Sequence, residues 1–520
     1  MPLEAPVIRM VRKVVMRAIV RAAVWPWGRW HNSSVAERRR QPRGVVTLAL
    51  VEMWERFSYY GMVALLVLFL IEPEGSGFPP GPGEGFTEAD AAALFGVYSA
   101  LVLAAPLLGG WVGDRLTGPR RAFVAGGVLI ALGHFVLLAP GIGFFWFGLL
   151  VIAAGTGLLK PNISTTLGLL YDDDDPRRDG GFSLFYFGIN VGAFTAPIIC
   201  GWIATSYSYR LAFSVAGIGM VLGLVQYAIG RGRLGDAGKA VPRPATSGQR
   251  RTALMGGVGA LLAVAAVFAV TIGLLGFTAA VVSAVVTALV ALVAVLAFWA
   301  LLRRAKASPS EHRHLKAFLL LFIASVVYFT LSSQAGSTIT EFTQDWVQRG
   351  IGSFTMPTSW LLSINPVLVV IFAPVFAVLW TWLGRRAPTT PTKAVIGIVG
   401  VGLSFLVLTA PGFAAQDGRS SALGWVLLTF LILTWAELFI VPIALSTTTE
   451  ISPPGLTGQL LGLWYLAAAL GGALGGQTAR LVELLGYGGF FLASGAVVIV
   501  IGLAFLGLRR RWSEWLAPFR

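Results

Sequence analysis

Long apolar segments recur along almost the whole chain, and most of them are long enough to cross a membrane as a helix. An α-helix rises 1.5 Å per residue, so about 20 apolar residues span the hydrocarbon of a bilayer. Hydrophobic residues make up 56% of the 520 residues and charged residues only 12%, roughly half the charged share of soluble domains. The sequence therefore predicts an all-α, polytopic membrane protein, and it excludes soluble, collagen-like and disordered classes.

The apolar segments number about 14 and form groups of six, two and six. They lie at about 45–71, 88–113, 120–139, 144–168, 183–204 and 211–230, then 253–276 and 278–302, then 316–341, 358–384, 392–411, 422–447, 456–481 and 486–508. The predicted parts are a basic leader (1–44), a first six-helix bundle (45–230), a linker with two extra spans (231–315), a second six-helix bundle (316–508) and a tail (509–520).

Basic residues alternate between the connections in a way that predicts orientation. The connection after the second span carries Arg115, Arg120 and Arg121, whereas 72–90 carries five acidic residues and no Lys or Arg. Loops rich in Lys and Arg stay in the cytoplasm. We therefore predict a multi-pass protein of the cell membrane, surrounded by lipid bilayer, with both termini in the cytoplasm. The leader is predicted to form a basic interfacial helix; a leader without a role is the alternative.

The motifs of common enzymes and of nucleotide binding are missing from the sequence. It contains no H-E-x-x-H, G-x-x-x-x-G-K-[ST] or G-x-S-x-G pattern, so we predict no enzyme, no metal site and no cofactor. The net charge of +15 comes from residues between apolar runs, which favours a role in topology over binding to nucleic acid. The lone cysteine, Cys200, cannot form an intramolecular disulfide.

Ionisable residues inside the predicted first span are a functional signal. Such a residue costs about 2.5–3.5 kcal/mol at the bilayer centre and usually faces a bundle interior. Glu52, Glu55, Arg56 and Tyr59 share one helix face because their offsets are 0, 3, 4 and 7. Two carboxylates beside one cation leave a group that can take a proton. A solvated cluster at the membrane edge is the alternative.

Two further charged residues lie within predicted spans. Lys160 follows about fifteen mostly apolar residues of the span at about 144–168, and Glu437 has apolar runs on both sides in the span at about 422–447. A buried lysine keeps its charge only beside a carboxylate or an anionic ligand. We expect both residues to face a shared cavity, to which Asn190 and Asn365 add neutral hydrogen-bonding groups. The alternatives are a lysine that reaches the interface and a structural glutamate.

A motif after the second span has a weak repeat in the second half. The first copy, Gly-Trp-Val-Gly-Asp-Arg-Leu-Thr-Gly-Pro-Arg-Arg at 110–121, contains the candidate gating residues Gly113, Asp114, Arg115 and Arg120. The echo is Leu-Trp-Thr-Trp-Leu-Gly-Arg-Arg at 379–386. The pair predicts two related halves with a site between them at mid-membrane. Ordinary juxtamembrane positive charge is the alternative.

Five motifs together resemble the proton-dependent oligopeptide transporter family, a branch of the major facilitator superfamily. They are Glu-x-x-Glu-Arg-Phe-x-Tyr-Tyr-Gly at 52–61, Gly-Thr-Gly-Leu-Leu-Lys-Pro-Asn at 155–162, Phe-Tyr-Phe-Gly-Ile-Asn-Val-Gly-Ala-Phe at 185–194, Ile-Asn-Pro at 364–366 and Gly-Leu-Trp-Tyr-Leu at 462–466. The resemblance extends over about 45–510. It implies the major facilitator fold and a symporter that imports di- and tripeptides with protons by alternating access.

The resemblance also implies roles for single residues. Glu52, Glu55 and Arg56 would couple proton to substrate binding, Lys160 would support coupling and hold the peptide carboxylate, and Glu437 would contact the amino end and pair with Lys160. Asn190 and Asn365 would bind the peptide backbone. The matched pocket aromatics are Tyr59, Tyr60, Tyr98 and Trp464, with Phe329 in place of a tryptophan. We predict that the transporter functions as a monomer, with protons as its coupling ion.

Two departures from the family pattern concern its outer gate. Val63 stands where many bacterial relatives have an arginine, and Ser333 where they often have a glutamate. Losing both is electrostatically consistent, because losing one would leave a buried charge unpaired. We hypothesise that Lys160 holds the peptide carboxylate without that arginine and that the outer gate is apolar. The alternative function is a proton-driven exporter or a transporter of another small amphiphilic metabolite.

Overall fold

The structure is a computed structural model that describes residues 41–72, 85–172, 175, 177–242, 244–276, 278–304, 309–383, 386–451 and 457–516. The chain divides into two units, Met1–Pro42 and Arg43–Arg520, and the elements below all belong to the second. The predicted interfacial helix of the leader lies outside the described residues. The predicted division into a leader, two bundles, a linker and a tail remains a prediction.

The described chain is almost entirely helical. The first part contains α3 (Arg43–Ile71), α4 (Glu88–Val112), the π-helical turn η1 (Gly113–Thr117), α5 (Pro119–Val136), α6 (Ile142–Gly168), α7 (Arg178–Ser206), α8 (Tyr209–Gly230), η2 (Arg231–Leu234), α9 (Ser247–Leu275) and α10 (Ala279–Arg304). The second contains α11 (Pro309–Ser332), η4 (Ser333–Gly336), α12 (Thr338–Trp346), β1 (Val347–Gln348), β2 (Gly350–Ile351), β3 (Phe354–Thr355), η5 (Thr358–Ser363), α13 (Ile364–Leu383), α14 (Thr390–Val407), α15 (Thr409–Gln416), β4 (Ser421–Ala422), α16 (Leu423–Ile451), α17 (Thr457–Ala479) and α18 (Leu481–Leu516).

The predicted helical membrane architecture is confirmed, but the number of about 14 spans is not. Within the described ranges, twelve helices have the length and apolar composition needed to cross a bilayer. The two others that the prediction counts are α5 and α9. Helix α5 is short and begins at Pro119-Arg120-Arg121, and in α9 only Leu262–Leu275 form an apolar helix of 10–17 residues.

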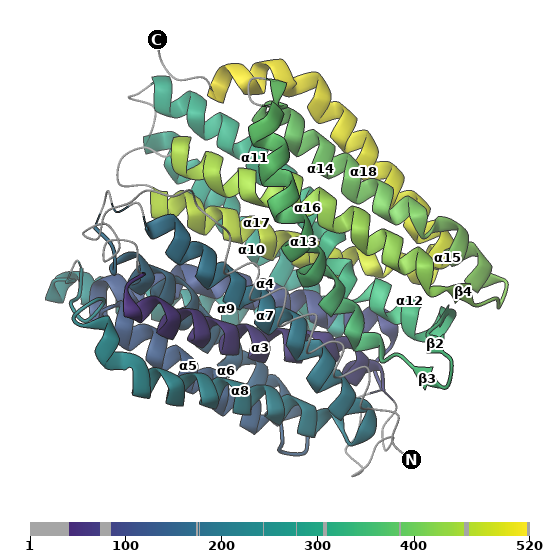
Figure 1. Ribbon diagram of the computed structural model, residues 1–520, viewed down its shortest axis with the longest axis horizontal. Helices are drawn as coiled ribbons and strands as arrows, with labels where there is room; N and C mark the ends of the chain where they lie inside the picture. Colours follow the sequence, from purple (N-terminus) through teal and green to yellow (C-terminus); the bar gives the residue numbers. More distant parts are fainter. Residues whose placement is uncertain are drawn as a thin grey trace, which may run out of the picture. The chain divides into compact units, whose positions relative to one another are not determined.

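The first bundle (α3–α8) and the second bundle (α11–α18) meet along α4 and α17 (Figure 1). Glycines allow this close approach, because a Cβ added to Gly96 would lie 2.9 Å from the carbonyl oxygen of Gly472. Helix α10 packs on both α4 and α17. Its Phe298 stacks on Phe318 of α11, with ring centroids 5.7 Å apart. The second of the extra helices therefore shares a core with the second bundle.

The two ends of the helices differ in their connections. At one end lie α12 and the short strands, with β1 paired in parallel to β4 and β2 antiparallel to β3 (Figure 1); we call this the hairpin end. At the other lie η1, η2 and the linker that leads to α9, and we call this the linker end. At the hairpin end, α7 bonds to the second bundle: Ser363 Oγ donates to the Phe194 carbonyl at 2.8 Å and Trp360 Nε1 to the Ile198 carbonyl at 3.2 Å.

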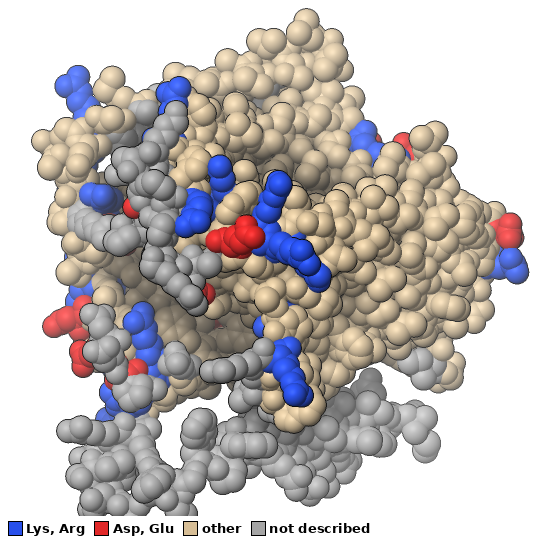
Figure 2. All heavy atoms as spheres, turned by 90° about the horizontal axis from the view of Figure 1, so that it is seen from above, with Lys and Arg blue, Asp and Glu red and all other residues tan. Residues whose placement is uncertain are grey.

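The outer surface of the helices is apolar over wide areas, as expected of a surface in contact with lipid. Ile229, Leu274 and Trp382 are each 78–79% exposed. Figure 2 shows one face on which uncharged residues cover most of the described surface, while Lys and Arg gather mostly toward one end. Such a distribution is typical of a protein whose middle faces hydrocarbon and whose charged ends face water.

The backbones of helices α4 and α6 are in contact where the helices cross. This contact fixes the position of the part of α6 that carries Lys160. A Cβ on Gly109 would lie 1.9 Å from the carbonyl oxygen of Gly157. We expect Gly109→Ala to destabilise the protein by about 1–3 kcal/mol, because the helices must separate to admit the methyl group. Thermal unfolding in detergent measures the change. Gly143→Ala is the matched control, since a Cβ there meets nothing within 4 Å; equal stability of the two variants would contradict the prediction.

Candidate functional site

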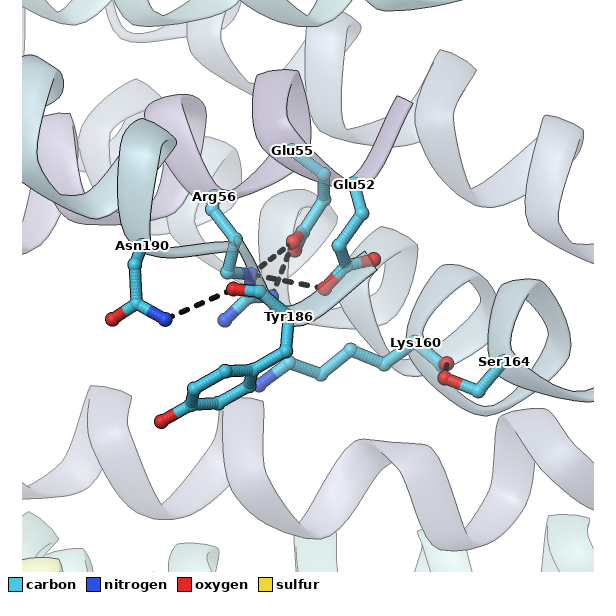
Figure 3. A network of polar contacts seen from close by, with 7 residues as sticks. All are labelled: Glu52, Glu55, Arg56, Lys160, Ser164, Tyr186 and Asn190. Carbon is cyan, nitrogen blue, oxygen red and sulfur yellow. Dashed lines mark hydrogen bonds and ion pairs between the residues drawn. The ribbon is translucent and has the colours of Figure 1, made fainter. Parts of the chain in front are cut away.

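A buried charge cluster lies in the middle of α3. Glu52, Glu55 and Arg56 are only 3%, 1% and 4% exposed. Arg56 Nε lies 3.4 Å from Glu52 Oε1, and the Arg56 guanidinium also forms a short ion pair with Glu55 (Figure 3). Within the described chain, Glu52 Oε2 and Glu55 Oε1 have no hydrogen-bond partner. The predicted helix face is therefore a buried triad in which two carboxyl groups share one cation.

The ring of Tyr59 joins this triad to Lys160 of α6. Arg56 Cζ lies 4.9 Å from the ring centroid and Lys160 Nζ lies 5.5 Å from it. The side chain of Lys160 extends from α6 past the triad and toward Tyr186 of α7 (Figure 3). Two cations thus contact one aromatic ring, an arrangement that favours an anion close by.

Lys160 has no carboxylate partner of its own. Among the described residues it forms no ion pair within 4.0 Å, so the implied pairing of Lys160 with Glu437 is not seen. Two hydroxyl-bearing neighbours shape its helix: Ser164 Oγ donates to the Lys160 carbonyl at 3.3 Å and Thr165 Oγ1 to the Pro161 carbonyl at 2.9 Å. A half-buried ammonium group that interacts with Glu52 and Glu55 only beyond ion-pair distance is suited to a ligand carboxylate.

The second bundle contributes a carboxyl group held by an amide. Asn365 Nδ2 donates to Glu437 Oε2 at 2.7 Å and to Thr434 Oγ1 at 3.1 Å. Glu437 lies close enough to Tyr60 and Tyr186 of the first bundle to interact electrostatically with their hydroxyl groups. The structure therefore brings Glu437 and Asn365 together and turns them toward the first bundle.

The predicted aromatic residues form two separate pairs and one isolated buried tyrosine. Phe329 and Trp464 meet edge to face, with centroids 5.8 Å apart, and Tyr59 and Tyr60 do so at 5.1 Å. Tyr98 is buried, and its hydroxyl has no partner within the described ranges. Asn190 donates to the carbonyl of Tyr186 in its own helix, at 2.9 Å, so that its amide oxygen remains available.

Sequence reasoning missed three neighbours of the site. Tyr186 and Thr434 are described above, and Tyr465 interacts electrostatically with Glu52 across the two bundles. Tyr186 stands in the Phe-Tyr-Phe-Gly motif and Tyr465 follows Trp464, so both could have been found by their motifs. Thr434 lies one helical turn before Glu437, which was the available signal for that residue.

The departures at Val63 and Ser333 leave no charge at those positions. Val63 is buried among apolar residues of the first bundle, and Ser333 Oγ donates to the Thr330 carbonyl at 3.1 Å. However, Arg480 Nη2 bonds to Asp90 Oδ1 at 2.8 Å and joins the two bundles at the same end. An ion pair therefore joins the two bundles at the hairpin end, and the hypothesis of an apolar outer gate remains a prediction.

The loop motif holds helices together at the linker end. A Cβ on Gly113 would lie 1.7 Å from Asn162 Oδ1, so only glycine fits there. Asp114 and Arg115 continue into η1, where the Arg115 carbonyl accepts from the Ala245 amide at 3.1 Å. Arg120 donates to the Tyr227 hydroxyl at 2.7 Å and to the carbonyls of Gly235 and Arg231 at 2.8 Å each.

The linker segment that follows η2 is also stabilised by an ion pair between two of its own residues. Lys239 Nζ donates to Asp236 Oδ1 at 2.8 Å. That hydrogen bond, together with the charge of Lys239, lowers the pKa of Asp236 below its usual value. Arg120 therefore bonds to a linker whose turn is also stabilised by the Lys239–Asp236 pair.

We expect Arg120→Ala to release the linker, because three hydrogen bonds from a charged donor are lost together. Amide hydrogen exchange over 231–238 should become at least tenfold faster, while exchange within α3 stays unchanged. The matched control is Arg121→Ala, which removes an exposed neighbour of the same type. If both variants exchange at the wild-type rate, Arg120 does not hold the linker.

No metal site accompanies these residues: the described part of the chain contains no group of three or more His, Cys, Asp or Glu residues placed to hold an ion. The prediction that no cofactor is needed remains a prediction.

Comparisons with known proteins give matches over most of the chain. The model of the PTR2 (POT) family matches residues 120–487. The chain is 38% identical over 463 residues to the uncharacterized transporter YclF of Bacillus subtilis (strain 168), covering 89% of this chain and 92% of that protein. It is 35% identical over 479 residues to a di-/tripeptide transporter of Lactococcus lactis subsp. lactis (strain IL1403), covering 90% and 95%. A crystal structure of the peptide transporter POT in complex with sulfate matches with a TM-score of 0.85 at 34% identity, covering 91% of this chain and 96% of that one.

Proposed function

Because this chain belongs to the POT family, we propose that it is a proton-coupled symporter that imports di- and tripeptides by alternating access. The observation that carries the proposal is the buried triad of α3, which shares the Tyr59 ring with Lys160 and stands opposite Glu437. Relatives named di-/tripeptide transporters support the substrate class. The alternative, a proton-driven exporter, is not favoured by these relatives.

The charges of the site match the two ends of a peptide. Lys160, which lacks an acidic partner within the described residues, receives the peptide carboxylate. Glu437, held by Asn365, receives the amino group. Asn190 and Asn365 bond to the peptide backbone. The aromatic residues Tyr59, Tyr60, Tyr98, Phe329 and Trp464 line the space for side chains.

Glu52 and Glu55 provide the proton site in this proposal. Arg56 pairs with both carboxyl groups, and Lys160 acts on them from farther away, so one carboxyl group can take a proton without disturbing the pair formed by the other. The proton drives transport only if its affinity differs between the two conformations. Rocking of the bundles changes access of water to the triad, which supplies that difference.

The available driving force is sufficient for concentration of peptide. A membrane potential of 100 mV contributes about 2.3 kcal/mol per charge, and a pH difference of one unit contributes about 1.4 kcal/mol. One proton could thus drive a neutral peptide to a concentration ratio of about 500.

We propose that the transporter lies in the cell membrane with the linker end and both termini in the cytoplasm. The basic residues Arg115, Arg120 and Arg121 near the linker end support this orientation. The hairpin end, with its bonds between α7 and η5, is then closed toward the outside. The monomer contains both halves of the site, so we propose that it is the functional unit.

Uptake of labelled dialanine into proteoliposomes tests the proposal. Accumulation should require an inward proton gradient, and a panel of unlabelled di- and tripeptides should compete while single amino acids do not. Equal accumulation with and without the gradient would defeat the symport mechanism. Proton-driven efflux of amphiphilic compounds without peptide uptake would favour the exporter instead.

A further inference from the structure

A second group of carboxyl residues lies at the hairpin end, apart from the triad of α3. Glu88 begins α4 in the first bundle, while Glu341 and Asp345 lie on α12 in the second. Tyr487 of α18 donates its hydroxyl proton to Glu88 Oε2 at 2.5 Å. The group therefore spans the boundary between the two bundles and is joined across it by a hydrogen bond.

Glu341 is the unusual member of this group. It is 2% exposed, and its Oε1 atom has no hydrogen-bond partner among the described residues. The groups that act on it electrostatically are Glu88 and Asp345, both potentially negative. A buried carboxylate whose Oε1 atom has no donor, and which lies beside other carboxyl groups and the Tyr487 hydroxyl, is disfavoured, so a neutral, protonated Glu341 is favoured in the closed structure.

The contact between Glu88 and Asp345 also favours a bound proton at the hairpin end. Their side chains lie close enough to interact. Two carboxyl groups can bond to each other only when one of them carries a proton, since ionised carboxylates have acceptors alone. The hydrogen bond from Tyr487 to Glu88 forms whether or not Glu88 is ionised, so only the contact between Glu88 and Asp345 calls for a bound proton.

The cations of the region do not replace these protons. Arg480 pairs at 2.8 Å with Asp90, which lies two residues after Glu88. Arg349 interacts electrostatically with Asp345, but its guanidinium donates to backbone carbonyls, at 2.9 Å to Met356 and 3.3 Å to Gln344. Glu341 therefore receives no direct compensation from either arginine.

We propose that Glu341 and Asp345, which lie beside Glu88 and Tyr487, form a second proton-binding site, which helps to hold the two bundles together at the hairpin end while it is protonated. When the bundles separate there, water reaches Glu341 and Asp345 and they ionise; the cost of burying the ionised groups again then opposes closure. The ligand of this site is the proton. The statement that these protons come from outside rests on the proposed function, in which the hairpin end faces outward.

Spin-label distances across the hairpin end test this inference without any transport. Labels at Ser206→Cys, at the end of α7, and Ser420→Cys, just before β4, report on the two bundles in a Cys200→Ala background. The full-length protein in lipid nanodiscs, without peptide, should be closed at acidic pH and should gain an open population as the pH rises. In Glu341→Gln and Asp345→Asn, which mimic protonated groups, the pH-induced change in the open-to-closed ratio should shrink at least tenfold.

Two further variants make the result specific. Glu483→Gln removes an exposed carboxyl group in the first turn of α18 and should keep the wild-type pH profile. Tyr487→Phe removes the donor to Glu88 and should raise the open population at acidic pH. Asp345 is exposed, so Asp345→Asn carries the test even if Glu341→Gln does not fold. A wild-type profile in both Asp345→Asn and Tyr487→Phe, or a pH-independent wild type, would overturn the inference.

The outcome is separable from that of the proposed function. Exchange of labelled dialanine across proteoliposomes measures transport independently of the labels. A transport-active wild type whose hairpin end does not respond to pH would refute the second proton site alone. A pH-dependent closure in a protein that transports no peptide would refute the symport mechanism alone.

Discussion

Replacing Arg56 with leucine is expected to destabilise the protein by about 3–5 kcal/mol, because it leaves two buried carboxyl groups without their cation. The guanidinium lies 3.4 Å from Glu52 and also pairs with Glu55, and all three side chains are buried. Chemical unfolding in detergent micelles, followed by circular dichroism, measures the loss. Proton-driven uptake should fall to background in the same variant.

A triple variant separates the charge from the packing. Glu52→Gln and Glu55→Gln, combined with Arg56→Leu, remove the charges together and should recover most of the lost stability, while gradient-driven uptake stays absent. Arg121→Leu, an exposed arginine, is the control and should unfold like the wild type. If Arg56→Leu alone is as stable as the wild type, or no less stable than the triple variant, the triad is not a compensated buried cluster.

Lys160→Ala is expected to weaken peptide binding by about 10- to 150-fold, because a hydrogen bond to a charged partner contributes roughly 1.5–3 kcal/mol. Lys160 has no acidic partner within 4.0 Å in the described chain, so the lost interaction is with the ligand. Equilibrium binding of a labelled dipeptide to the purified protein measures the change.

The ligand itself provides the sharpest control for Lys160. A dipeptide amide has no carboxylate, so Lys160→Ala should change its affinity little. Lys393→Ala removes a lysine of α14 that lies 4.3 Å above the ring of Trp380, and it should leave binding unchanged. Unchanged binding of the free-acid dipeptide to Lys160→Ala would show that Lys160 does not hold the peptide carboxylate.

Periodic apolar segments were enough to predict the helical fold, since a membrane tolerates few other structures. The number of spans was harder to predict. Helix α5 begins at Pro119-Arg120-Arg121 and α9 begins with six polar or small residues, so among the described residues these two helices lack the apolar length that the other twelve have. The break of the predicted span at 316–341 into α11, η4 and α12 was also not predicted. It depends on Gln334, whose amide bonds to Gly475 and Thr478 of a distant helix.

The candidate site was predictable where its residues share one helix. The offsets of Glu52, Glu55 and Arg56 placed them on one face, and the structure pairs them. Contacts between helices could not be deduced in the same way. Asp90 and Arg480 are 390 positions apart, and no local pattern relates them. For the same reason the sequence could not exclude the pairing of Lys160 with Glu437, which depends on the distance between two bundles.

Helix α10 has a consequence for any motion of the bundles. It contacts α4 of the first bundle and α17 of the second, and it cannot stay fixed to both when they rotate apart. Gln477 of α17 donates to Ser283 of α10 at 2.8 Å, and Phe298 packs into the core of the second bundle. We therefore expect α10 to move together with the second bundle, so that the contact between α10 and α4 is the one that changes when the bundles rotate.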